Sequence, residues 1–216
     1  MALDELGIEE LRELYAPMRD KIQARLSEFR SSWEEGRDSE IQSELIFCLL
    51  TPQSRARACW AAVMNLCKKG LLWDGEPGQV QEELVGVRFK YRKAEYICKA
   101  MEGLGREGRL RATLQEFDDP YEAREWLVRN VLGMGFKEAS HFLRNIGLGE
   151  DLAILDRHIL RNLLRLGAVH EMPSSLSRSR YLEVEARMRE LSLRTAIPMG
   201  DLDLLLWYRE TGEIFK

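Results

Sequence analysis

The 216-residue chain is 45% apolar and 31% charged, a composition that suits a folded globular protein and excludes a disordered one. Its net charge of −4 argues against indiscriminate binding to nucleic acid, and no apolar run approaches the roughly 20 residues of a membrane span. The first segment, MALDELGIEELREL, is acidic and amphipathic, unlike a secretory signal, so we expect a cytoplasmic protein.

Charge is unevenly distributed along the chain. Residues 1–45 carry twelve acidic and six basic side chains, whereas residues 85–111 carry eight basic and three acidic ones. A protein that meets an anion on one face would show this polarity, and a solvated helix face would show it too.

Helical periodicity accounts for nearly every segment. Residues 41–51 (IQSELIFCLLT) are apolar all round, which predicts a central buried helix, with Ser39 and Gln42 as its capping box. After TPQS, residues 55–70 predict an amphipathic helix that ends in glycine. Further helices are predicted at 91–105, 121–133, 137–147, 156–167, 177–191 and 200–210. No strand pattern is present, so we predict an all-α fold forming a single module over residues 1–216.

The four cysteines are Cys48, Cys59, Cys67 and Cys98. They include no C-x-x-C pair, which argues against a disulfide framework or a structural zinc site. No closely spaced cysteines follow residue 98 to hold an iron–sulfur cluster. We therefore expect free thiols and no cofactor.

Residues 132–147 (LGMGFKEASHFLRNIG) place Gly133 and Gly135 between two predicted helices. Glycines allow backbone angles closed to other residues, and the N–H groups that begin the second helix could hold a DNA phosphate. A plain αα-turn would use glycine equally well. The predicted hairpin spans about residues 121–147.

Two residues near this hairpin could carry chemistry. Lys137 begins the second helix, where the helix dipole disfavours a cation, and a partly desolvated amine there is a usable nucleophile. It could also be a surface charge. Asp156 precedes a predicted helix as an N-cap, although a carboxylate near an amine could also stabilise positive charge on a sugar.

The segments LVRNVLGMGFKEASHFLRNIG and AILDRHIL resemble the helix-hairpin-helix glycosylase superfamily. More narrowly, the chain resembles the archaeal-type 8-oxoguanine DNA glycosylase/AP lyases over essentially its whole length. The resemblance implies two helical lobes with the active-site cleft between them. It implies that Lys137 attacks C1′ of a flipped nucleotide, forms a Schiff base and nicks the strand by β-elimination, with Asp156 supporting the charge.

The resemblance also implies how DNA is held. Gly133 and Gly135 would contact the DNA backbone, and the carbonyls of Arg129, Val131 and Met134 match positions that hold a monovalent cation, Na⁺ or K⁺, against a phosphate. The chain lacks the C-terminal cysteines of the endonuclease III branch, which usually binds an iron–sulfur cluster.

Four residues are candidates for substrate contacts. Gln53 matches a loop that relatives insert into the duplex, although it could simply be a capped loop residue. Phe89 and Trp207 are nominated as aromatic walls of a base pocket, although most such aromatics belong to the core. The final Lys216 would help to separate 8-oxoguanine from guanine.

The expected partner is double-stranded DNA containing 8-oxoguanine. We expect the protein to act as a monomer and not to bind a membrane. Two alternatives remain open at this point. One is another lesion specificity on the same fold, such as oxidised pyrimidines or mispaired adenine. The other is a non-catalytic DNA-binding module that uses the hairpin only to grip phosphate.

Overall fold

The computed structural model describes residues 5–105 and 108–216, and within these residues it contains helices and no strand. The helices are α1 (Glu5–Glu34), α2 (Asp38–Leu50), α3 (Ala56–Lys68), α4 (Leu71–Asp74), α5 (Pro77–Glu83), α6 (Lys90–Leu104), α7 (Arg109–Leu114), α8 (Pro120–Asn130), α9 (Phe136–Asn145), α10 (Arg157–Arg165), α11 (Arg178–Thr195) and α12 (Met199–Thr211). The all-α prediction is confirmed. None of the described helices has an apolar stretch long enough to cross a membrane.

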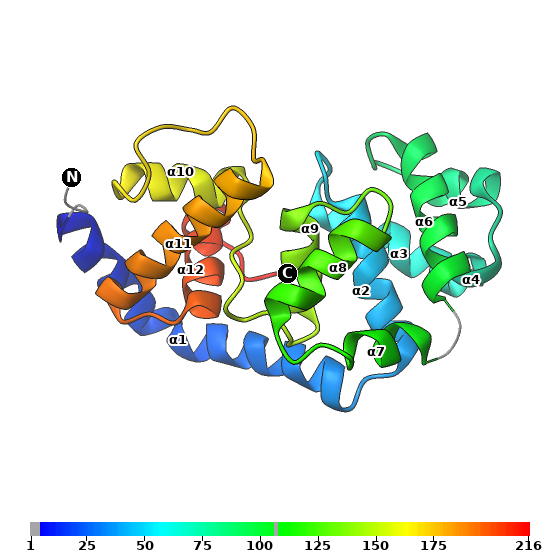
Figure 1. Ribbon diagram of the computed structural model, residues 1–216, viewed down its shortest axis with the longest axis horizontal. Coiled ribbons are helices and arrows are strands. Elements are labelled where there is room, and N and C mark those ends of the chain that lie inside the picture. Colours follow the sequence, from blue (N-terminus) through cyan, green and yellow to red (C-terminus); the bar gives the residue numbers. More distant parts are fainter. Residues whose placement is uncertain (1–4, 106–107) are drawn as a thin grey trace.

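The helices form two lobes, each with its own hydrophobic core. One core is built from buried residues between positions 41 and 152, which belong to α2–α9 and define the central lobe. The other combines residues 8–29 with residues 153–206, so α1 and α10–α12 define the terminal lobe. Figure 1 shows the long helix α1 running beneath both lobes. The predicted two-lobed arrangement is confirmed.

The central lobe is built around α2, in which every residue from Ile41 to Leu50 is buried, as the all-round apolar pattern predicts. Its predicted cap is wrong. The helix begins two residues earlier, with Arg37 as N-cap and the Arg37 N–H donating to Glu40 Oε2 at 3.3 Å. Ser39 therefore lies inside the first turn, where its carbonyl accepts from the Ser43 hydroxyl.

After α1 has led from the terminal lobe to the central lobe, the chain crosses between the lobes twice more near their junction. The segment between α9 and α10 passes from the central to the terminal core between Leu152 and Ala153. The tail after α12 passes back, since Ile214 packs on the terminal core and Phe215 on the central one. In Figure 1 the C-terminus lies between the lobes. These crossings bring α9, the start of α10 and the tail together.

The four cysteines are free thiols, as predicted. Cys48 and Cys59 are buried, and Cys67 and Cys98 are half-buried.

Candidate active site

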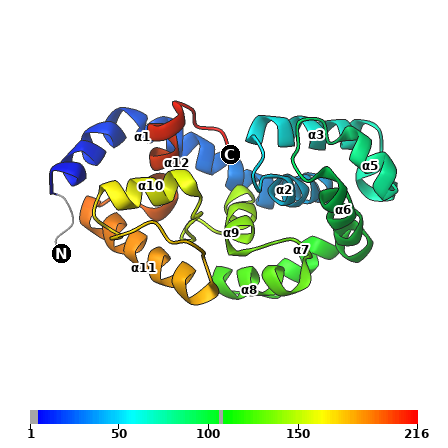
Figure 2. The same cartoon turned by 90° about the horizontal axis from the view of Figure 1, so that it is seen from above.

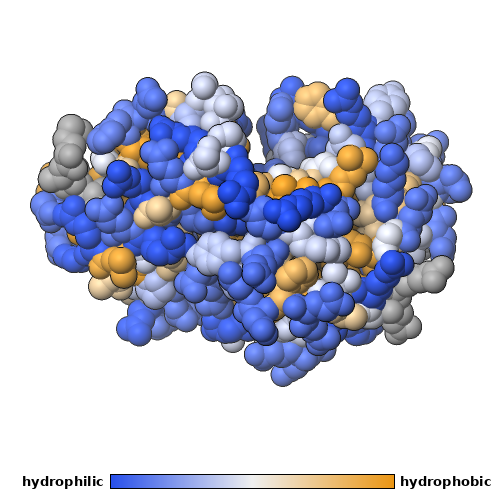
Figure 3. All heavy atoms as spheres, in the orientation of Figure 1, coloured by the Kyte–Doolittle hydropathy of each residue, from blue (hydrophilic) through white to orange (hydrophobic). Residues whose placement is uncertain are grey.

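A cavity of about 670 Å³ lies between the lobes, at the point where Figure 3 shows the surface hollowed. Its walls come from the loop after α2, the first turns of α9 and α10, α12 and the tail. The lining includes Thr51, Gln53, Arg88, Lys137, His141, Asp156, His158, Asp203, Trp207 and Lys216. Residues from the first third, the middle and the C-terminal end of the sequence therefore share one concave surface.

Lys137 lies in the first turn of α9 and faces this cavity. Its Nζ is 2.9 Å from Glu138 Oε1 and donates to Thr51 Oγ1 at 3.2 Å. Only about one fifth of the side chain is exposed. The surface-charge reading of Lys137 is therefore wrong, because the amine is held by two partners at the cavity wall. Glu138 also offsets the unfavourable interaction with the helix dipole.

The two hairpin glycines have different roles. Gly133 has φ +85°, in the left-handed region, and an added Cβ would lie 2.3 Å from the Tyr96 ring. Gly135 has φ −98° and ψ −178°, an extended conformation open to any residue, so the prediction that it needs glycine's backbone freedom is wrong. It is the N-cap of α9, and its N–H donates to Glu138 Oε2 at 3.2 Å.

Asp156 is the N-cap of α10, as predicted. Its Oδ1 accepts hydrogen bonds from the N–H groups of His158 at 2.8 Å and Ile159 at 2.9 Å. Both cap bonds go to one oxygen, so capping leaves Oδ2 available to another partner. Since Asp156 lines the same cavity as Lys137, the structure brings the two predicted catalytic residues together from opposite lobes.

Trp207, Gln53 and Lys216 also line the cavity. The Trp207 ring meets His158 edge-on, with centroids 5.0 Å apart. Gln53 has φ 55°, a strained backbone for a non-glycine residue, at the tip of the exposed loop after α2.

The tail is held against the central lobe through Lys216. Its ammonium forms an ion pair with Glu44 and lies 3.5 Å from the centroid of the Trp60 ring. Burial lowers the pKa of Lys216, and the Glu44 carboxylate opposes this shift. The preceding carbonyl of Phe215 accepts from Arg25 Nε at 2.6 Å.

Known proteins share this architecture. Residues 22–197 match the family described as 8-oxoguanine DNA glycosylase. An 8-oxoguanine DNA glycosylase/AP lyase from Fusobacterium nucleatum is 44% identical over 209 residues, 96% of each chain. One from Methanocaldococcus jannaschii is 37% identical over 209 residues, 97% of each chain. The chain belongs to the 8-oxoguanine DNA glycosylase family.

Solved structures of the family have the same fold. The crystal structure of the Methanocaldococcus jannaschii 8-oxoguanine glycosylase/lyase in complex with a 15mer DNA containing 8-oxoguanine gives a TM-score of 0.88 at 36% identity, covering 97% of this chain and 99% of that one. The Thermotoga maritima 8-oxoguanine DNA glycosylase gives 0.86 at 37% identity, covering 97% and 98%. The predicted glycosylase fold is confirmed.

Phe89, nominated from the sequence as an aromatic wall of a base pocket, lies elsewhere. Its side chain is 54% exposed and does not line the cavity, so its assignment as a pocket wall is wrong. Phe89 precedes α6 with φ 58°, and its ring lies under the Arg88 guanidinium. It belongs to the exposed rim of the central lobe.

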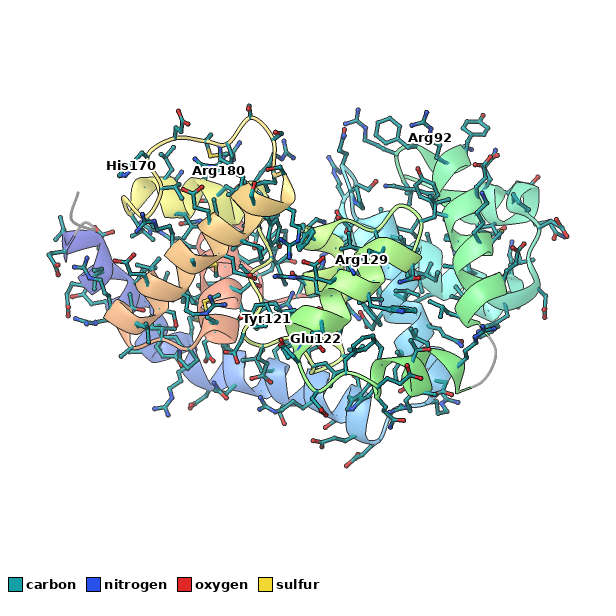
Figure 4. The ribbon with its side chains drawn as sticks, viewed as in Figure 1. Arg92, Tyr121, Glu122, Arg129, His170 and Arg180 are labelled. Carbon is teal, nitrogen blue, oxygen red and sulfur yellow. The ribbon has the colours of Figure 1, made fainter. Side chains whose placement is uncertain are left out.

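Only part of the basic segment 85–111 presents its charges to solvent. Arg88 and Arg92 are exposed, and Figure 4 shows Arg92 on the upper edge of the central lobe. Lys93 is buried, with Nζ donating to the carbonyls of Leu50 and Pro52 at 2.7 Å. Arg111 pairs with Asp38 at 3.0 Å. Residues 106 and 107 lie outside the described part of the chain.

The predicted cation site of this family remains a prediction. Arg129, Val131 and Met134 lie at the end of α8 and in the hairpin, where carbonyl oxygens at the negative end of a helix dipole suit a monovalent cation. The Val131 carbonyl accepts from the Met134 N–H at 3.2 Å, which leaves it one lone pair for an ion.

Sequence reasoning missed Asp203, which lines the cavity from α12. Oδ2 is 3.5 Å from Arg144 Nη1, and Oδ1 has no hydrogen-bond partner among the described residues. Burial raises the pKa of Asp203 to about 7; Arg144 opposes the shift and Asp156 adds to it. An acidic residue inside the apolar run LDLLLW was the signal, because buried carboxylates are rare unless they have a purpose.

Proposed function

We propose that this chain excises 8-oxoguanine from double-stranded DNA and nicks the resulting abasic site by β-elimination through a Schiff base on Lys137. One observation supports the assignment above the others. Lys137 and Asp156 come from different lobes, yet both open onto one cavity of about 670 Å³. Such a cavity can receive a base only after the nucleotide leaves the duplex, as chemistry on a base requires.

Lys137 is the proposed nucleophile. After the ammonium has given up one proton to solvent, its amine attacks C1′, the C1′–N9 bond breaks, and the electron pair leaves with the base, which takes up a proton. The amine then loses a proton as the sugar ring opens to the imine. Loss of a C2′ proton expels the 3′-phosphate and cuts the strand. The contacts to Thr51 and Glu138 hold the amine in place for this attack.

Asp156 is the proposed electrostatic partner. As the glycosidic bond stretches, positive charge develops on the sugar, and a fixed carboxylate stabilises that charge without reorganisation. The two N–H groups bound to Oδ1 fix the carboxylate, so Oδ2 can face the sugar. A module that only grips phosphate would require neither Lys137 nor Asp156.

The cavity wall supplies groups suited to a guanine-type base. Asp203 supplies a carboxylate at the cavity wall, a group that can accept from N1–H or N2–H₂ on the Watson–Crick edge of the base. The Trp207 ring supplies an apolar surface, and Lys216 closes the wall from the central side. An oxidised pyrimidine would leave part of this surface unfilled, which favours the purine lesion.

The DNA backbone would meet the hairpin. The N–H groups that begin α9 and the close turn at Gly133 suit a DNA phosphate. A Na⁺ or K⁺ ion held by the carbonyls at the end of α8 would contribute positive charge to the same phosphate site.

We infer that the protein acts as a monomer. The proposed substrate and the bacterial and archaeal relatives support a further inference, that it acts with the chromosome in the prokaryotic cytoplasm.

Borohydride trapping tests this function directly. On 8-oxoguanine duplex DNA, the wild type should form a covalent complex, excise the base and nick the strand. Lys137→Gln should still bind lesion DNA but lose all three activities together, because each one needs the amine. Lys99→Gln, at an exposed lysine of α6, is the matched control and should match the wild type. Full nicking by Lys137→Gln would refute the assignment.

A further inference from the structure

A buried polar network lies behind the active site, between α8, α9 and α11. At its centre Arg124 forms a bidentate pair with Glu185, with N–O distances of 2.6 and 2.9 Å. Their side chains are only 1% and 3% exposed. Withdrawing both charges from water carries a large desolvation penalty, so a buried ion pair need not stabilise the fold. The position of this pair in the protein therefore calls for an explanation other than stability. Figure 2 shows the two helices, α8 and α11, meeting at this side of the molecule.

The network holds the backbone of the segment that leads to Asp156. This segment has no helical hydrogen bonds of its own, so its polar groups need other partners. The Ala153 N–H donates to Glu185 Oε1 at 2.9 Å. The Tyr181 hydroxyl donates to the Ala153 carbonyl at 2.6 Å and accepts from the Leu155 N–H at 3.4 Å. Two side chains of α11 therefore fix both residues 153 and 155.

The same network reaches α9 through Ser140. Arg124 Nη1 donates to Ser140 Oγ at 3.1 Å, and Ser140 Oγ lies 3.4 Å from the Tyr181 hydroxyl oxygen. Tyr181 directs its one proton chiefly to the closer acceptor, the Ala153 carbonyl, and Ser140 Oγ is its second, more distant acceptor. The hydrogen bonds thus run without interruption from α9 to the segment before Asp156.

The two ends of this chain are next to the two proposed catalytic residues. Ser140 lies three positions after Lys137, on the same face of α9. Leu155 immediately precedes Asp156. The Phe136 ring, just before Lys137, packs on Tyr181 with centroids 5.4 Å apart. Lys137 belongs to the central lobe and Asp156 to the terminal lobe. The distance between them therefore depends on the contacts that join α9 to the segment before α10.

We propose that Tyr181, supported by Ser140 and the Arg124–Glu185 pair, is a positioning residue that sets the separation of Lys137 and Asp156. The proposal rests on the function proposed above. Tyr181 does not line the cavity, so it acts through the backbone at 153–155 rather than on DNA. A misplacement of about 1 Å in such a pair can slow a reaction about 10²-fold.

Tyr181→Phe tests the proposal, because it removes one oxygen and keeps the ring against Phe136. Single-turnover excision and β-elimination on 8-oxoguanine duplex should slow about 10- to 100-fold. The dissociation constant for the same DNA should stay unchanged, because no cavity-lining atom is lost. A purely structural role would lower the folded fraction and leave the rate of the folded enzyme intact.

Tyr15→Phe is the matched control. Its hydroxyl also donates to a buried acceptor, Asp201 Oδ2 at 2.8 Å, but it joins α1 to α12 away from both catalytic residues. It should lose stability while keeping the wild-type excision rate. Equal rates in Tyr181→Phe and Tyr15→Phe, each measured on folded protein, would overturn the positioning role.

Ser140→Ala keeps the test open if Tyr181→Phe does not fold. It removes the α9 end of the same chain and should slow excision in the same way, whereas a wild-type rate in this variant would contradict the proposal. Where both variants fold, the double variant should be little slower than Tyr181→Phe, since the two act through one hydrogen bond. If the wild type neither excised 8-oxoguanine nor formed the borohydride-trapped complex, the proposed function itself would be refuted, whatever the variants did.

Discussion

Asp156 performs two tasks with two oxygens. Oδ1 satisfies two N–H groups at the start of α10, a role that many N-cap aspartates have. Oδ2 remains for the cavity, where the proposed chemistry places positive charge. The structural and catalytic tasks can therefore be separated by a substitution that alters charge but keeps capping.

Asp156→Asn is that substitution. Asparagine caps as well as aspartate, so the melting temperature should change little. The neutral amide cannot stabilise the sugar cation, and single-turnover excision should slow about 10²- to 10³-fold. Asp119→Asn is the control, since Asp119 caps α8 in the same way through Tyr121 N–H. If Asp156→Asn excised as fast as Asp119→Asn, Asp156 would be only a cap.

Asp203 predicts a pH effect on stability. Burial raises its pKa to about 7 in the folded protein. Between the usual pKa of aspartate, about 3.9, and pH 7, the folded state holds a proton that the unfolded state has lost. The stabilisation from that proton is complete below the unfolded pKa and is lost as pH rises through the folded pKa, at up to about 1.4 kcal/mol per pH unit.

Asp203→Asn removes this titration. The stability of the variant minus that of the wild type should therefore rise from pH 4 to pH 7, measured by denaturant unfolding at each pH. The difference is needed because burial lowers the pKa of His141, which acts in the opposite sense below its usual pKa. A difference that stays flat across this range would show that Asp203 is ionised in the fold.

At the scale of elements, the hairpin depends on one glycine more than on the other. Gly133 → Ala should destabilise the protein by about 2–5 kcal/mol, from the left-handed backbone and the clash with Tyr96. Gly135→Ala should cost less than about 1 kcal/mol, because its φ suits alanine and its new Cβ meets only the flexible end of Glu138. Thermal unfolding of both variants checks the order, and equal costs would contradict it.

The sequence predicts the elements better than it predicts their ends and surroundings. Helical periodicity and the Gly-x-Gly turn depend on neighbouring residues, so α2, α8 and α9 are recognisable from local pattern. The Ser39 cap fails because the Glu40 carboxylate accepts from the Arg37 N–H, which starts the helix two residues earlier. Phe89 fails because its left-handed backbone turns an apolar side chain outward, which no periodicity reveals.

At the scale of the whole molecule, the active site depends on contacts that local pattern cannot predict. Lys137 could be singled out because it breaks a local rule at a helix start. The Arg124–Glu185 pair and the buried Lys93 could not, because their partners lie far away in sequence. The resemblance to a family supplied the two lobes, whereas the path of the chain between them comes only from the structure.

The tail is the last of the three crossings between the lobes. Lys216 reaches from the terminal lobe to Glu44 on α2, and Glu44 also accepts from Asn145 Nδ2 on α9 at 2.9 Å. The positive charge of the ammonium is therefore balanced by Glu44, and the group is fixed in place rather than free in the cavity. Its side chain still forms part of the wall, so Lys216 can set the register of a bound base.

Deleting Lys216 should weaken excision of 8-oxoguanine, or raise excision of guanine relative to it, without unfolding the protein. The reason is that a base held in the wrong register loses the contacts that distinguish the two purines. Single-turnover excision from paired 8-oxoguanine and guanine duplexes measures the ratio, with melting temperature as the folding check. Glu44→Gln should shift the ratio in the same direction, because it weakens the hold on Lys216. Glu213→Gln, which breaks an exposed tail contact to Arg57 at 2.7 Å, should leave it unchanged. An unchanged ratio in the deletion would mean that Lys216 only anchors the tail.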